Sequence, residues 1–313
     1  MKKINLIIFL LLFIFVACTK EVNLNDIDVE QYIVVNSLFT SNEYLTVNIC
    51  KTGLNLANPQ ITPVTDAGVV LWSNNEEIEK LTHDSAGYYS TKFYKLQEDK
   101  EYTITVDVDG FKQVKATSII PEKVPILGHN VEIHNKIIEG NYFSTLEFTF
   151  KDPVNQKNYY IININIVEHD STVYDEIIRS DDNFFISYDE NNHPSLGLDN
   201  SYFYLIFDDV NLNSNTTKAT INYFTNNNIY WNNEDTLATK ILKFHNVSKD
   251  MYLYYKSANI LEVIRNEPIF NQTNYYFNLY SNIQNGIGIF AGYNTTIDTF
   301  LLNGEKYNCV ELK

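Results

Sequence analysis

Apolar and polar residues alternate along much of this chain once the first thirty residues are passed. Leu45, Val47 and Ile49, for example, are separated by polar residues, and a period of two is typical of a β-strand with one buried face. Segments with this pattern, or with a short apolar run of strand length, are 45–50, 69–72, 102–108, 111–116, 146–150, 162–166, 202–207, 219–224 and 275–279. We therefore expect a mainly β protein.

Turn signals separate several of these strands. Asp109-Gly110 stands between two alternating runs and is the strongest hairpin signal, because a two-residue turn needs positive φ at both positions. Ser73-Asn74-Asn75 predicts another turn. Cys50 falls on the strand face opposite Leu45, Val47 and Ile49.

One segment has a helical period instead. After Ser248, a plausible N-cap, Met251, Tyr254, Tyr255, Ala258 and Leu261 recur at helical spacing. This pattern predicts a helix over about 249–263 that packs an aromatic face onto a sheet.

The strand spacing also predicts the domain organisation. Short strands over some ninety residues favour an immunoglobulin- or transthyretin-like β-sandwich at 31–122. Pro121 and Pro125 mark a boundary, because proline removes hydrogen-bond donors and stiffens a link. Residues 123–313 are then expected to form a second antiparallel β domain that carries the helix.

The N-terminus predicts export and lipidation. Lys2 and Lys3 precede an unbroken apolar run of 13 residues, Leu6 to Cys18, and a membrane-spanning helix needs about 20. The run ends in Phe15-Val16-Ala17-Cys18, the form of a bacterial lipobox, although leucine is usual where Phe15 stands. We interpret residues 1–17 as a lipoprotein signal peptide, Cys18 as the lipidated residue and 18–30 as a tether.

Composition and charge narrow the partners. The formal charge is −16, and removal of residues 1–17, which takes away Lys2 and Lys3, would change it to −18. Such an acidic body has no electrostatic reason to bind nucleic acid. Cys50 and Cys309 could form a disulfide or both stay free, and nothing in the sequence decides between these alternatives.

Candidate chemistry is sparse. We find no phosphate loop, nucleophile elbow or zinc-helix motif, so no catalytic, metal-binding or cofactor-binding residue is predicted. Asp181-Asp182 and Asp208-Asp209 could hold Ca²⁺ but are more simply solvated loops. Short Asp-Ser/Thr patterns that could accept O-linked glycans begin at Asp84, Asp170 and Asp235. The six histidines are scattered over His83, His129, His134, His169, His193 and His245.

Several motifs together resemble one family. Glu21 to Asn25 after the lipobox, Tyr32 to Asn36, Ala116 to Pro121 and Phe150 to Pro153 match its successive landmarks. The most distinctive stretch is Ser281-Asn282-Ile283-Gln284-Asn285-Gly286-Ile287-Gly288-Ile289-Phe290. The chain thus resembles a Bacteroidota lipoprotein family known as domain of unknown function 4249. We expect Gly286 and Gly288 to let the chain turn or pack closely.

The resemblance implies an outer-membrane lipoprotein, often encoded beside a TonB-dependent transporter, without catalytic residues. Lys20-Glu21 also resembles the signals that send such lipoproteins to the cell surface. The leading hypothesis is a non-enzymatic accessory protein, held to the bilayer by acyl chains on Cys18, that helps a transporter capture or deliver a nutrient. The alternative is a surface adhesin or glycan-binding lipoprotein without a transporter. A glycan and a peptide both stay open as ligands.

Overall fold

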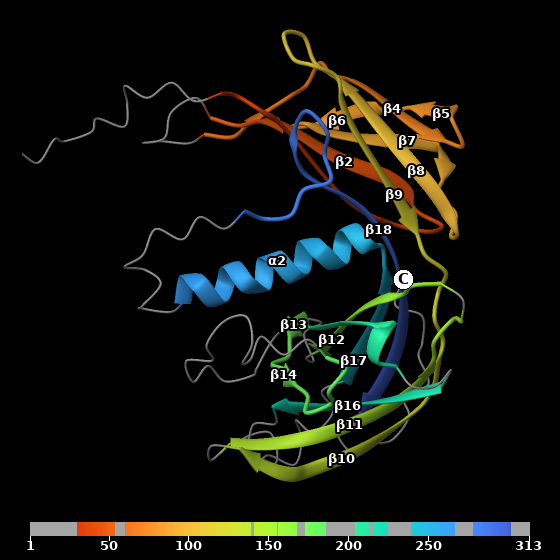
Figure 1. The fold of residues 1–313 in the computed structure, drawn as a ribbon, viewed down its shortest axis with the longest axis vertical. Coiled ribbons are helices and arrows are strands. Elements are labelled where there is room, and N and C mark those ends of the chain that lie inside the picture. Colours follow the sequence, from red (N-terminus) through yellow and green to blue (C-terminus); the bar gives the residue numbers. More distant parts are fainter. Residues whose placement is uncertain are drawn as a thin grey trace, which may run out of the picture.

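The structure is a computed structural model. It describes residues 30–53, 60–138, 141–154, 156–167, 173–185, 204–212, 216–224, 239–266 and 278–301. Within these ranges the protein is mainly β, with one long α-helix, α2 (Lys249–Asn266), as the sequence predicted. Figure 1 shows this helix lying between two β-rich lobes. No helix in the described part of the chain has both the length and the apolar character needed to cross a membrane.

A long sheet runs through both lobes. Its strands are β1 (Ile33–Thr40), β2 (Tyr44–Lys51), β3 (Thr62–Pro63), β6 (Thr82–Ser85), β7 (Tyr88–Lys95), β12 (Tyr159–Val167), β13 (Val173–Asp175), β15 (Leu205–Asp208), β17 (Thr239–Val247) and β18 (Ile287–Leu301). They follow the order β13-β12-β17-β18-β1-β2-β7-β6, with β15 beside β12 and β3 beside β2. A short 3₁₀ turn, η3 (Asp209–Asn211), follows β15.

Two smaller sheets pack against the long sheet, one in each lobe. The N-lobe sheet has the order β5-β4-β8-β9, from β4 (Gly68–Ser73), β5 (Glu76–Lys80), β8 (Lys100–Asp107) and β9 (Val114–Ile120). The C-lobe sheet has the order β10-β11-β16-β14, from β10 (Ile126–Ile138), β11 (Asn141–Lys151), β14 (Ile178–Arg179) and β16 (Thr216–Phe224). Each lobe is thus a two-layer β structure around its own core.

The predicted alternation is confirmed in the N-lobe core. Leu45, Val47 and Ile49 of β2 are fully buried and share one core cluster with Tyr102 and Ile104 of β8. Burying one such side chain stabilises the fold by about 1.5–3 kcal/mol relative to leaving it exposed. The period of two therefore decides which face of each strand turns inward.

β18 belongs to both lobes, which the sequence did not predict. Its first half pairs in parallel with β1 up to Tyr293, and its second half pairs antiparallel with β17 from Tyr293 onward. Phe290 lies in the N-lobe core and Phe300 in the C-lobe core. The boundary expected near residue 122 therefore leaves out the strand over 287–293 that completes the N-lobe sheet.

The hairpin turns differ from the prediction in one respect. A hairpin does join β8 to β9. However, Gly110 has positive φ (78°) and Asp109 does not, so the prediction of a two-residue turn at Asp109-Gly110 is wrong. A longer loop between Val106 and Val114 takes its place. The two-residue turn with both φ angles positive lies at Asn74 and Asn75, between β4 and β5. Asparagine adopts this conformation more readily than most residues.

The structure also tests the predictions made for Cys50 and for a strand over 275–279. Cys50 does face away from Leu45, Val47 and Ile49, yet it is buried, and it is free. Its candidate partner Cys309 lies outside the described residues. The strand predicted over 275–279 is wrong at its described end, because the chain at 278–282 makes side-chain contacts instead of a ladder.

The helix begins and ends close to its predicted bounds. The backbone N–H of Met251 donates to Ser248 Oγ (3.3 Å), which confirms the N-cap. The predicted inward face is only partly right: among residues 249–261, Met251 is buried, but the other buried positions are Tyr252, Ser257 and Asn259. The helix contacts both the long sheet and the segment before β18, so burial does not follow a single stripe.

Candidate functional site

The predicted lipidation site falls outside the described part of the chain. Cys18, the signal peptide at 1–17 and Lys20-Glu21 precede Glu30, the first described residue. The anchor therefore stays a prediction. The same holds for the O-glycosylation patterns at Asp170 and Asp235, whereas Ser85, after Asp84, is exposed.

In the two acidic pairs, the carboxylates of Asp182, Asp208 and Asp209 accept hydrogen bonds from backbone N–H groups. Asp182 accepts a hydrogen bond from the Thr220 backbone N–H (2.6 Å), and Asp209 accepts one from the Asn158 backbone N–H (2.7 Å). Asp208 caps η3 by accepting from the Val210 backbone N–H. Among the described residues, no group of three or more His, Cys, Asp or Glu side chains could hold a metal ion.

Two hollows lined by described residues lie on the α2 side of the long sheet. A first hollow of about 450 Å³ is lined by Leu38, Ile161, Asn163, Tyr204, Met251 and Tyr255, together with Asp175. A second hollow of about 550 Å³ lies toward the turn between β1 and β2, where Ser41, Glu43 and Glu98 line it. Both hollows share Lys243, His245 and Tyr293. We call the two together the groove, and each lies within the size range of small-ligand sites.

The floor of the groove is a row of polar side chains across neighbouring strands. His245 of β17 contacts Thr295 Oγ1 of β18 through Nδ1 (2.7 Å) and Asn163 Oδ1 of β12 through Nε2 (2.9 Å). Asn165, one step farther along β12, donates to Asp175 (2.6 Å). Strand pairing brings these groups together, because cross-strand neighbours share a face of the sheet.

Burial sets the charge of this floor. Burial, helped by the nearby Lys243 ammonium, lowers the pKa of His245 to about 4, so the imidazole is neutral at pH 7. Two bonds to neutral oxygens would also suit a doubly protonated ring, but the low pKa excludes that form at neutral pH. His245 therefore offers a hydrogen-bonding surface without charge.

Aromatic rings form the sides of the groove. Tyr204 and Tyr255 meet edge to face with centroids 5.0 Å apart, and Tyr293 meets His245 in the same way at 5.9 Å. Burial raises the pKa of Tyr255 and of Tyr293, so both hydroxyls stay neutral. Such aromatic contacts hold the rings in place, and Tyr255 and Tyr293 border the groove.

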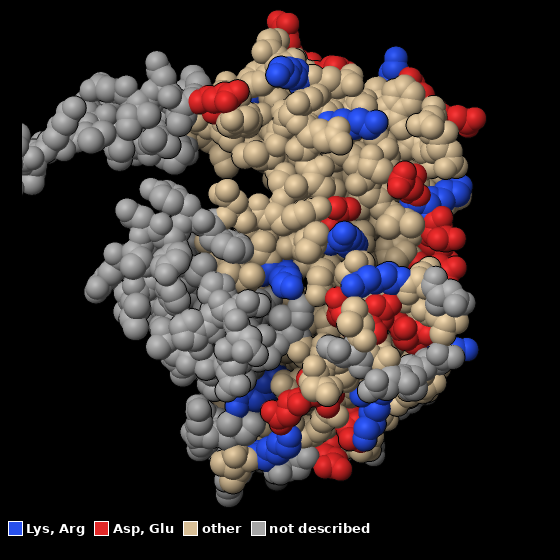
Figure 2. All heavy atoms as spheres, viewed as in Figure 1, with Lys and Arg blue, Asp and Glu red and all other residues tan. Residues whose placement is uncertain are grey.

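Lys243 stands at the centre of the groove. It is half-buried, and it makes no ion pair with any carboxylate in the described ranges. By contrast, Lys240, three residues earlier on β17, is buried against Glu176 in the C-lobe. On the face drawn in Figure 2, acidic and basic side chains are interspersed. The groove thus has Lys243 at its centre and the exposed Lys123 in the second hollow, and a bound anion could neutralise either cation.

Sequence reasoning missed the groove residues. The alternation of Ile162, Ile164 and Ile166 did place Asn163 and Asn165 on the opposite face, and that was the only local signal. His245 was noted among scattered histidines. Nothing in the sequence paired it with Asn163, which is 82 residues away.

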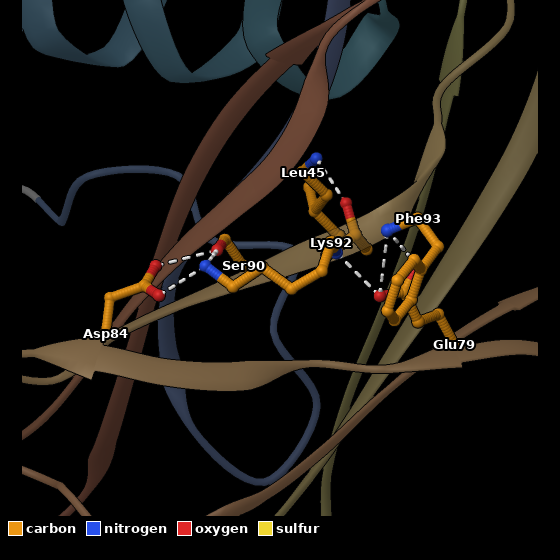
Figure 3. Close-up of polar contacts among 7 residues, drawn as sticks. Leu45, Glu79, Asp84, Ser90, Lys92 and Phe93 are labelled. Atoms are coloured by element: carbon orange, nitrogen blue, oxygen red, sulfur yellow. Dashed lines mark hydrogen bonds and ion pairs between the residues drawn. The ribbon is translucent and has the colours of Figure 1, made fainter.

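A second surface feature lies in the N-lobe, where β7 bulges at residues 91–94. The Glu79 carboxylate accepts hydrogen bonds from the backbone N–H groups of Lys92 (2.6 Å), Phe93 (3.3 Å) and Tyr94 (2.9 Å). Thr91 Oγ1 accepts from the Leu45 backbone N–H. Figure 3 draws the bonds from the backbone N–H groups of Lys92 and Phe93 to the Glu79 carboxylate. Phe93 is 91% exposed, so a rigid backbone presents a bare aromatic side chain.

The comparison with known families can now be set beside this geometry. The family described as Domain of unknown function (DUF4249) matches residues 19–298. The chain belongs to this family. No curated protein matches the DUF4249 chain at a significant level.

The stretch that suggested the DUF4249 family has a structural role here. Asn282 acts like a neighbouring strand for β18, because its side chain donates to Phe290 O (2.7 Å) and accepts from Phe290 N (3.0 Å). Gln284 exchanges backbone hydrogen bonds with Lys115 of β9. A Cβ on Gly288 would lie 2.2 Å from Val35 O, and one on Gly286 would lie 2.7 Å from Ile33 O. The expectation of close packing at both glycines is confirmed.

Proposed function

We propose that this chain is an outer-membrane lipoprotein, anchored by acyl chains on Cys18, whose groove captures a nutrient for a TonB-dependent transporter without catalysis. The observation that carries the proposal is the groove itself. It combines neutral hydrogen-bonding groups, aromatic rings and two lysines, Lys243 and Lys123, that make no ion pair in the described ranges, which is the usual make-up of a ligand site.

Four further features support the proposal. The lipobox before Cys18 supports the anchor, and Lys20-Glu21 supports export to the cell surface. The transporter partnership follows from the resemblance to lipoproteins that are often encoded beside such transporters. Phe93, held on its pinned bulge, suits a contact with a protein partner, because a pre-ordered aromatic residue loses little freedom on binding.

The test is co-purification of the native protein with a transporter in mild detergent. We expect a TonB-dependent transporter to be recovered with the wild-type protein and to be reduced in the Phe93→Ser variant. Val210→Ser is the matched control, because Val210 is also an exposed apolar residue (66%) but lies in the C-lobe.

Recovery of the wild-type protein alone, under conditions in which known transporter complexes survive, would contradict the partnership and favour the adhesin or glycan-binding alternative. The anchor has a separate test. Cys18→Ser should abolish the diacylglyceryl mass increment, and a wild-type protein whose mass shows no such increment would rule out lipidation at Cys18.

A further inference from the structure

We infer that the groove binds an oligosaccharide that carries a carboxylate, with its sugar rings against Tyr255 and Tyr293 and its carboxylate at the Lys243 ammonium. This inference rests on the proposed binding role of the groove and names its ligand class. It does not depend on the transporter.

The two hollows act as one site because they meet at shared residues. Lys243, His245 and Tyr293 line both, with the smaller hollow extending toward Asp175 and the larger one toward Glu43. A ligand that fills both must be elongated and must pass over Lys243. A chain of linked sugar rings has this form.

The floor favours a hydroxylated ligand. His245 is bonded to Asn163 and Thr295, so the floor has no net charge. The Asn163 carbonyl oxygen and the Thr295 hydroxyl oxygen each have a further lone pair that can accept a hydrogen bond. Sugar hydroxyls both donate and accept, and they can meet such a surface without leaving a polar group unpaired.

The rings favour a sugar over a highly polar chain. Tyr255 comes from α2 and Tyr293 from β18, and they border the first hollow from two elements. The apolar C–H face of a pyranose ring packs well on an aromatic ring, while the tyrosine hydroxyls stay within reach of the sugar oxygens. Fixed rings lower the entropy cost of this contact.

The charges favour a single carboxylate. Lys243 has no acidic partner in the described ranges, so an incoming carboxylate would give it a charge-assisted hydrogen bond. Asp175 stands at one end of the groove, and Glu43 and Glu98 stand at the other together with the exposed Lys123, so that three carboxylates and two lysines line the whole groove. These carboxylates would repel a ligand that carried acid groups along its whole length. A ligand with one acidic sugar avoids that repulsion.

Calorimetry on the native, detergent-solubilised protein tests the inference. Three probes are compared: a short oligosaccharide with one uronic acid residue, the same oligosaccharide with that carboxyl reduced to an alcohol, and a peptide of similar length with a free carboxylate. We expect the acidic oligosaccharide to bind about tenfold or more tightly than its reduced form, because one charge-assisted hydrogen bond is lost.

Variants assign the contacts. Lys243→Met should weaken the acidic oligosaccharide about tenfold and leave the reduced one unchanged, while Tyr293→Ala should weaken both and Tyr293→Phe should retain most of the binding. Lys95→Met is the matched control, because Lys95 lies over Tyr44 in the N-lobe, outside the groove. Far-UV circular dichroism verifies that each variant is folded.

A measurement on the wild-type protein tests the inference even if a variant fails to fold. The acidic oligosaccharide should protect Lys243, but not Lys95, from amine acetylation followed by mass spectrometry. Tighter binding of the peptide, or equal reactivity of Lys243 with and without the oligosaccharide, would overturn the ligand class. The transporter would still co-purify in that case, so failure of this inference and failure of the proposed function can be told apart.

Discussion

At the residue scale, the groove depends on a histidine that is neutral in the folded protein. His245 lies between Asn163 and Thr295, and burial together with the Lys243 ammonium lowers its pKa to about 4. The pKa of an unperturbed histidine is about 6.5. The difference couples the stability of the fold to pH.

The sign of this coupling follows from proton counts. Between about pH 6.5 and 4 the unfolded chain binds the proton on His245 and the folded protein does not, so stability contributed by this group is complete above 6.5 and falls as the pH drops toward 4. The loss should approach about 3 kcal/mol below pH 4. Urea titrations of wild-type and His245→Gln proteins across this range measure it. If the unfolding free energies of the two proteins depended on pH in the same way, the assignment to His245 would be contradicted.

A glycine gives the second prediction at this scale. Gly288 has φ +119°, and an added Cβ would meet Val35 O at 2.2 Å. Gly288→Ala should therefore cost at least about 2 kcal/mol of unfolding free energy. Gly128→Ala is the control, because nothing lies within 4 Å of a Cβ there. The measurement is the urea midpoint of each variant. Similar losses of stability in the two variants would show that position 288 tolerates a Cβ as well as position 128 does.

At the element scale, α2 is positioned by its first turn. Ser248 caps the helix, and its own backbone N–H donates to Gly292 O of β18 (2.9 Å). Asp250 accepts from the hydroxyls of Ser118 in β9 and Tyr280 before β18. These contacts fix the helix between the lobes and place Met251 and Tyr255 at the edge of the groove.

Loss of the cap should destabilise the protein modestly. Ser248→Ala removes the side-chain acceptor of the Met251 N–H and should cost about 1 kcal/mol. Lys249→Ala removes an exposed residue at the same end of the helix and should have no such cost, since a cation is unfavourable near a helix N-terminus. Thermal unfolding compares them. If Lys249→Ala is as harmful as Ser248→Ala, the cap is not the cause.

At the scale of the whole molecule, the lobes share a strand. β18 pairs with β1 in the N-lobe and with β17 in the C-lobe, and His129 of β10 binds Asp298 of β18 (2.5 Å). A strand common to both lobes cannot leave one core without disturbing the other. The lobes should therefore unfold together.

Trp72 can report this coupling. In a Trp231→Phe background, Trp72 of β4 is the remaining tryptophan of the two in the chain. Leu146→Ala empties part of the C-lobe core, where Leu146 is fully buried, and should cost about 2–5 kcal/mol. We expect the Trp72 fluorescence transition to shift to lower urea concentration. An unshifted Trp72 transition would mean that the lobes unfold independently.

Local chemistry explains why much of this fold could be predicted from the sequence. The alternation at Leu45, Val47 and Ile49 fixed a strand and its inner face, and Ser248 with the helical period fixed α2 almost to its ends. These features depend on neighbours within a few residues, because side-chain direction repeats every two residues in a strand and every three to four in a helix. The same reasoning gave Gly288 its role in close packing.

Only the tertiary structure decided which distant segments meet. It brought 287–293 beside β1, set His245 next to Asn163, turned Tyr252 rather than Tyr254 inward, and collected the groove from β1, β12, β17, β18 and α2. No local period encodes these pairings. They form because one shared sheet covers two separate cores. The free energy gained by burying those cores arises only when the whole chain is packed.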